Sequence, residues 1–245
     1  MKRYSVIPVV FACALGPAAG GAQNSPPSIQ RGLHYTITMG GEPVGTSEVV
    51  VEPERDGRVK AQPGHPWPAP LASIPSVTLR NRTRIAIKSL LFSYHYASSA
   101  HETWSGDRLI SAEADTVENG VASHVVVRRE ADHMIVITNK GERRLTGNVA
   151  TASFWNLPRL PDATSVFLDV ETGADFQMQA RFVKETEITI SGSAVPCRLW
   201  RLSGDAKTQL WFDRDDVLVR VEYQEQGQRF VHILNRPTTT LKEKK

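Results

Sequence analysis

Cysteine is almost absent from this 245-residue chain, which contains only Cys13 and Cys197. Cys13 lies in an N-terminal segment whose removal is predicted below, so Cys197 would remain alone and no disulfide could form within the remaining chain. A single thiol in an exported protein is either buried or reactive. We expect Cys197 to be buried, because the run that follows it reads as a strand. Roughly 220 residues can bury a sufficient core without disulfides.

Long apolar runs are also missing, which argues against a membrane-spanning helix. The run at 6–15 is far shorter than the ~20 residues that cross a bilayer. Two basic residues precede it and small residues follow it, as in a secretory signal peptide. We therefore predict export to the periplasm or beyond, with residues 1–22 removed. Cleavage after Gly20 and lipidation at Cys13 are the alternatives.

Clustered charge of one sign is absent, apart from the short tail LKEKK. Removal of the signal peptide would take away two basic residues and no acidic ones, which leaves a nearly neutral chain. Nothing in this charge distribution supports nucleic-acid binding.

Motifs for metal binding or catalysis are missing as well. The seven histidines form no His-x-His or His-Glu-x-x-His pattern, although histidines from separate strands could still converge on zinc. Ser153 has no Gly-x-Ser-x-Gly elbow around it, so we expect a small packing residue. The carboxylate pairs Glu113 with Asp115 and Glu185 with Glu187 read as solvated strand faces. We expect no cofactor and favour a non-enzymatic protein, with an envelope hydrolase as the weaker alternative.

The chain does contain apolar and polar residues that alternate with a period of two almost throughout. The clearest alternation is at 175–190, and Asn119-Gly120 is a strong hairpin turn. About a dozen short strands follow from this pattern, which predicts a mainly β fold with a large curved antiparallel sheet or an open or half barrel. In the extended stretch 77–104 the apolar parity switches near residues 90–92, which we interpret as a bulge or a crossing between faces.

Domain organisation follows from the same pattern. We expect a single β domain at 33–236, a flexible segment at 23–32 before it and a polar tail at 237–245 after it. Within the domain, 55–75 contains five prolines and two glycines, so it is predicted to be a loop.

One segment departs from the period of two. Ala150, Phe154 and Leu157 recur at spacings of four and three, and Pro158 ends the run. This spacing predicts a short helix at 149–157, packed against the sheet with Phe154 on its buried face.

Aromatic residues are the best candidates for a binding site. A curved sheet with a helix over its open side could enclose an apolar pocket for a lipophilic small molecule, or bind a protein of the cell envelope. The candidate ligand contacts are Phe154, Trp155, Asn156, Trp104 and Trp211. The alternative is a filled core, in which these residues are ordinary core and the protein binds partners through its surface.

Three stretches carry a resemblance to a known family: 102–120, 152–156 and 210–223. Together they resemble exported bacterial proteins of unknown function that carry a Ser-Phe-Trp-Asn motif, a Thr-x-x-Asn-Gly hairpin and a Leu-Trp-Tyr-Asp strand. The matching residues are Trp104, Leu109, Thr116, Asn119, Gly120, Ser153, Phe154, Trp155, Asn156, Leu210, Trp211 and Asp213. Phe212 stands where tyrosine is usual. That family has no assigned activity.

More distantly, the layout is similar to periplasmic half-barrel proteins of the lipoprotein-carrier type. Those proteins curve an antiparallel sheet around a short helix and hold acyl chains. The similarity implies a fold and not a function.

Overall fold

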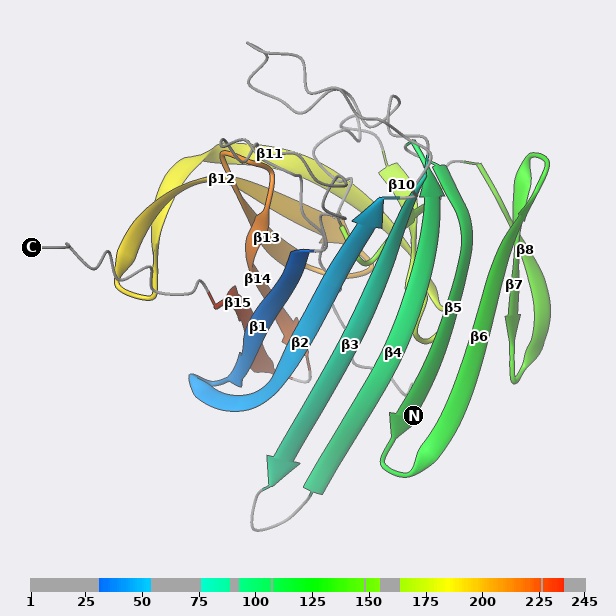
Figure 1. The fold of residues 1–245 in the computed structure, drawn as a ribbon, viewed down its shortest axis with the longest axis horizontal. Coiled ribbons are helices and arrows are strands. Elements are labelled where there is room, and N and C mark those ends of the chain that lie inside the picture. Colours follow the sequence, from blue (N-terminus) through cyan, green and yellow to red (C-terminus); the bar gives the residue numbers. More distant parts are fainter. Residues whose placement is uncertain are drawn as a thin grey trace, which may run out of the picture.

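The computed structural model describes residues 31–53, 76–88, 93–106, 108–147, 149–154, 164–225 and 227–235. Within them the chain forms one sheet of fifteen strands that rolls toward a barrel (Figure 1). The predicted mainly β fold and the curved, barrel-like sheet are confirmed.

The strands are numbered in their order along the chain. The first eight are β1 (Arg31–Met39), β2 (Glu42–Pro53), β3 (Val77–Lys88), β4 (Ser93–Ser105), β5 (Arg108–Glu118), β6 (Val121–Glu130), β7 (His133–Thr138) and β8 (Gly141–Thr146). The next seven are β9 (Val149–Thr151), β10 (Thr164–Leu168), β11 (Asp175–Ile190), β12 (Ser193–Gly204), β13 (Thr208–Asp213), β14 (Leu218–Glu225) and β15 (Gln228–Leu234).

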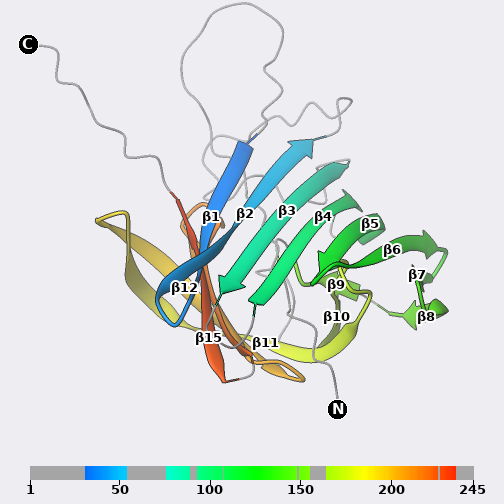
Figure 2. The same ribbon diagram turned by 90° about the horizontal axis from the view of Figure 1, so that it is seen from below.

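The sheet order brings the two halves of the chain together. Hydrogen bonding runs from β8 down to β1, passes to β15, and continues down to β9. The pairings are antiparallel except that of β9 with β10, which is parallel. Figure 2 shows β1 to β5 as one wall, with β11 curving below them toward β9 and β10. β9 contacts β5, so the sheet is nearly closed.

Alternation along each strand decides what lies inside. In β3 every second residue from Val77 to Ile87 is buried, and the residues between them, apart from half-buried Thr78, are exposed. β4 continues this interior face with Tyr96, Glu102 and Trp104. The interior face of β3 and β4 therefore carries an acidic residue, Glu102, as well as apolar ones.

The bulge or crossing predicted near residues 90–92 lies outside the described residues. On either side of it, the stretch 77–104 forms two antiparallel strands, β3 and β4, paired from Val77 with Trp104 to Lys88 with Ser93. The parity switch arises because the second strand of a hairpin starts a new alternation.

The predicted short helix was also wrong over its described part. Val149–Thr151 is strand β9, and the Ala152 amide continues its pairing by donating to the Leu168 carbonyl at 2.9 Å. Phe154 has a φ of 53°, which an α-helix does not allow. Residues 155–157 lie outside the described residues.

The described residues test only some of the remaining predictions. Cys197 is buried, as expected. The segments 1–22, 23–30, 55–75 and 237–245 lie outside the described residues, so the signal peptide, the proline-rich loop and the tail stay predictions. Across the described ranges, no helix has the length and apolar character needed to cross a membrane.

Candidate functional site

Two of the stretches that carry the family resemblance meet inside the barrel at Glu102 on β4. Its Oε2 accepts hydrogen bonds from Trp104 Nε1 at 2.9 Å, from Thr151 Oγ1 at 3.0 Å and from Ser153 Oγ at 3.2 Å. The hydroxyl oxygens of Thr151 and Ser153 lie 2.5 Å apart. These bonds fasten the turn after β9 to β4, so Ser153 is a buried donor and has no exposed surface for a substrate.

Burial dominates the electrostatics of Glu102. Desolvation raises its pKa to about 7, against the lowering effect of the donors from Trp104, Thr151 and Ser153. Its Oε1 has no hydrogen-bond partner among the described residues. A neutral carboxyl group suits this position, because an ionised oxygen without a donor would be costly to bury.

A second buried carboxyl group comes from the turn after β10. Glu171 reaches into the interior, where Oε1 accepts from Asn81 Nδ2 at 2.7 Å and Oε2 accepts from the Tyr96 hydroxyl. Its backbone carbonyl accepts from Thr116 Oγ1 at 3.1 Å. Three neighbouring strands, β3, β4 and β5, thus each donate to this one residue, and the turn fills the space between the walls.

Asp169 shapes that turn from within. Its Oδ1 accepts from the Glu171 amide at 2.9 Å and its Oδ2 accepts from Thr172 Oγ1 at 2.5 Å. Burial raises the pKa of Asp169 to about 6. Burial, followed by repulsion from Asp169, raises the pKa of Glu171 to about 8. We call Asp169, Glu171 and Glu102 the interior carboxyl groups.

The predicted ligand contacts fall in different places. Trp104 is 0% exposed and Phe154 is 1% exposed, and the Phe154 ring lies 5.8 Å from that of Phe167. Both are core residues. Trp155 and Asn156 lie outside the described residues, so their predicted role is not tested.

Trp211 lies apart from this group, on β13. Its cross-strand partners are Leu199 and Arg220, and the Arg220 guanidinium carbon lies 5.0 Å from the centre of the indole ring. The side chain is 8% exposed. The structure therefore brings Ser153 and Trp104 together through Glu102, but places Trp211 elsewhere in the sheet.

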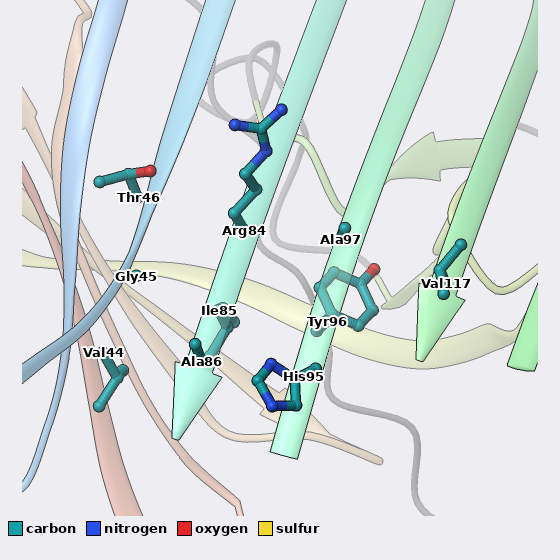
Figure 3. Close-up of a pocket in the computed structure, with 10 residues that line it drawn as sticks. All are labelled: Val44, Gly45, Thr46, Arg84, Ile85, Ala86, His95, Tyr96, Ala97 and Val117. Atoms are coloured by element: carbon teal, nitrogen blue, oxygen red, sulfur yellow. The ribbon is translucent and has the colours of Figure 1, made fainter. Parts of the chain in front are cut away.

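The outer face of the first wall carries a hollow of about 410 Å³ (Figure 3). Its lining residues are Val44, Gly45, Thr46, Arg84, Ile85, Ala86, His95, Tyr96, Ala97 and Val117. One cross-strand row, Thr46, Arg84, Ala97 and Val117, crosses it from β2 to β5. We call this feature the outer hollow.

Small residues create the outer hollow. Ala86 and Ala97 point outward where the sheet elsewhere presents longer polar side chains. At Gly45, a Cβ would meet the Arg84 carbonyl oxygen at 2.2 Å, so only glycine lets β2 approach β3 this closely. Val117 is 45% exposed and extends the apolar surface on β5.

A second outer depression, of about 230 Å³, lies on β2 and β3 and differs from the outer hollow in its charges. It is lined by Glu48, Val50, Arg80 and Arg82. Arg80 pairs with Glu52 at 3.2 Å, and Glu48 lies directly opposite Arg82. Its cations therefore face carboxylates, whereas the described lining of the outer hollow contains no carboxylate.

The sequence predicted neither the interior carboxyl groups nor the outer hollow. The exposed pairs Glu113 with Asp115 and Glu185 with Glu187 were correctly read as solvated. Glu102 was missed although it shares the parity of Trp104, which is the signal that could have found it. Within the described ranges, no group of three or more histidine, cysteine or acidic residues is arranged to hold a metal ion.

Comparisons with known proteins agree with this architecture. A family model described as a domain of unknown function (DUF6134) matches residues 72–235. The comparison with curated proteins found no match. A beta-barrel-like protein of domain of unknown function DUF1849 from Brucella abortus is similar in structure, with a TM-score of 0.56 and 9% identity over 84% of this chain and 96% of that chain. This likeness concerns the fold alone.

A DUF1089 family protein from Pseudomonas aeruginosa is also matched, with a TM-score of 0.39 and 10% identity over 91% of this chain and 100% of that chain.

Proposed function

Because the chain belongs to the DUF6134 family, whose domain has no known function, we propose a function from the site itself. The protein is an exported, non-enzymatic binding module that holds a lipophilic molecule in the outer hollow. The observation that carries this proposal is the hollow's apolar floor of Ala86, Ala97 and Val117 on a sheet face that is mostly polar. Its volume of about 410 Å³ lies within the usual range of ligand sites.

The interior is a poorer place for such a ligand. Trp104 and Phe154, the described aromatic residues of the predicted pocket, are already covered by protein atoms. The turn with Glu171 occupies the space between the walls and is hydrogen-bonded to three strands. A lipophilic molecule there would have to displace these polar contacts, which would leave buried donors without acceptors.

A non-enzymatic role is supported by how the interior carboxyl groups are used. Glu102 and Glu171 accept hydrogen bonds from the fold itself, and Ser153 donates to Glu102. None of these groups reaches the outer hollow. The export part of the proposal is supported by the basic start, apolar run and small residues of segment 1–22.

The test is binding of a neutral lipophilic dye, N-phenyl-1-naphthylamine, by protein purified from the periplasm of a bacterial host that expresses the full chain. We expect micromolar binding that Ala97→Trp abolishes by filling the hollow. Ser99→Trp, on the same strand and face but outside the hollow, should bind dye like the wild type. Equal binding by all three proteins would refute the outer hollow as the site.

Native mass spectrometry of the same preparation tests the export part of the proposal. A mass that lacks the N-terminal segment supports export, and retention of that segment contradicts it. If no dye binds, the filled-core alternative applies, and proteins that co-purify from the envelope fraction become the expected partners.

A further inference from the structure

Arg84 is placed differently from the other arginines of β3. Its direct cross-strand partners are Thr46 and Ala97, neither of which is charged. Arg80 pairs with Glu52, and Arg82 lies opposite Glu48. Among the described residues, no ion pair involves Arg84.

The nearest carboxylate on the neighbouring strand is already directed elsewhere. Glu48 lies one outer-face position along β2, opposite Arg82, and its Oε1 lies 3.9 Å from His34 Nε2. Among the described residues, the positive charge of Arg84 therefore has no acidic partner at the hollow, and the second basic side chain of the lining, His95, adds no negative charge.

Charge and apolar surface are separated within the outer hollow. Figure 3 shows the Arg84 guanidinium and His95 toward opposite ends, with Ala86, Ala97 and Val117 on the strands around them. A ligand that lies along this surface would meet a cation at one end and apolar side chains over the rest of its length.

We infer that the outer hollow selects single-chain amphiphiles with an anionic head group, a carboxylate or a phosphate. This inference rests on the proposed function and specifies its ligand. The planar guanidinium of Arg84 can donate two parallel hydrogen bonds to either head group. The hydrocarbon chain covers Ala86, Ala97 and Val117, and removal of this apolar surface from water supplies the larger part of the affinity.

The experiment compares five probes that compete with N-phenyl-1-naphthylamine, with each amphiphile kept below its critical micelle concentration. Dodecanoate and dodecyl phosphate carry the anionic head, and dodecanol has the same chain without charge. Acetate and inorganic phosphate serve as heads without a chain. We expect both anionic amphiphiles to displace the dye at about three- to tenfold lower concentration than dodecanol, and the isolated heads not to displace it.

Two variants assign the effect to a residue. Arg84→Gln should weaken dodecanoate and dodecyl phosphate about three- to tenfold and leave dodecanol unchanged, which removes the preference for anions. Arg82→Gln removes an equal charge from the same strand and face, two residues away. It should change neither the binding of the anionic amphiphiles nor that of dodecanol. Added salt should narrow the preference in the wild type and have no such effect in Arg84→Gln.

The outcomes separate this inference from the function on which it rests. If dodecanol competes as well as dodecanoate, or if Arg82→Gln acts like Arg84→Gln, the anionic selection is refuted while lipophilic binding stands. If acetate or inorganic phosphate displaces the dye, the hollow is an anion site without a chain subsite, and the inference is overturned. If neither the dye nor any amphiphile binds, the proposed function fails as well.

Discussion

The interior of the barrel and the outer hollow reverse the usual distribution of polarity. Inside, Glu102, Asp169 and Glu171 are buried among hydroxyl, amide and indole donors. Outside, Ala86, Ala97 and Val117 are exposed beside the charge of Arg84. Buried polar groups and exposed apolar surface are the two informative departures from ordinary burial.

The two departures have different explanations. The interior carboxyl groups accept hydrogen bonds from the fold, which explains them as structural links between β9, the turn after β10 and the strands β3 to β5. The outer hollow has nothing over it among the described residues, so its apolar surface has no structural use there. Buried polarity here indicates how the barrel is held together, and exposed apolar surface marks the site at which we propose binding.

The largest expected effect comes from removal of the Glu171 carboxyl group. In Glu171→Ala, the donors on Asn81 and Tyr96 lose their acceptors, so we expect the free energy of unfolding at pH 6 to fall by about 4 kcal/mol. Urea denaturation measures this change. Glu187→Ala, an exposed change on β11, should shift it by less than about 0.5 kcal/mol. A loss that small in Glu171→Ala would refute the structural role of the turn.

The next effect is a loss of stability as the pH rises above neutral. The pKa of Glu171 is about 8 in the folded protein and its ordinary value is 4.5, so between these values the folded state binds a proton that the unfolded state has released. Stability from this group is therefore complete below pH 4.5 and is lost as the pH approaches 8. Glu102, with a pKa of about 7, acts in the same direction.

His232 sets the lowest pH from which the loss of stability due to the carboxyl groups can be measured by itself. Burial lowers its pKa to about 3, so it adds stability as the pH rises to its ordinary value of 6.5 and opposes the carboxyl groups in that range. From pH 6.5 to 8 only the loss remains, and we expect about 2.5 kcal/mol in urea denaturation. Glu171→Gln should remove most of this slope, and an unchanged slope would contradict the assignment.

Alternation predicted most of the fold because one dry face and one wet face force a period of two on each strand. Over its described part, 149–154, the predicted helix was wrong because a spacing of four also fits a three-residue strand followed by a turn. The acidic turn could not be predicted. Glu171 has no periodic signal, and only the strands β3, β4 and β5 together supply its donors. Prediction of the outer hollow would have required the strand register, which aligns Arg84 with Ala97 and Val117.

The outer hollow can be deformed by adding one carbon atom to β2. In Gly45→Ala, the new Cβ would meet the Arg84 carbonyl oxygen at 2.2 Å, so β2 must move away from β3. We expect a loss of about 2 kcal/mol and at least tenfold weaker dye binding. Gly32→Ala on β1 is the matched control, because its Cβ would have no neighbour closer than 3.6 Å. Equal behaviour of the two variants would show that the close approach is unimportant.

The smallest expected effect is a loss of stability from a change in the interior that leaves the outer hollow unaffected. Ser153→Ala removes one of three donors to Glu102 Oε2, while the bonds from Trp104 and Thr151 remain. We expect a loss of about 1 kcal/mol, and a still higher pKa for Glu102 because its charged form loses a donor. Dye binding at the outer hollow should stay unchanged. Ser203→Ala, on an exposed position of β12, should change neither quantity.

A chemical probe completes the test of Ser153. A buried structural donor should not react with phenylmethylsulfonyl fluoride, so intact-mass measurement should find the folded wild-type protein unlabelled. Stoichiometric labelling that Ser153→Ala abolishes would instead make the serine an accessible nucleophile. The interior would then be a site of chemistry, and its contrast with the outer hollow as structure against binding surface would no longer hold.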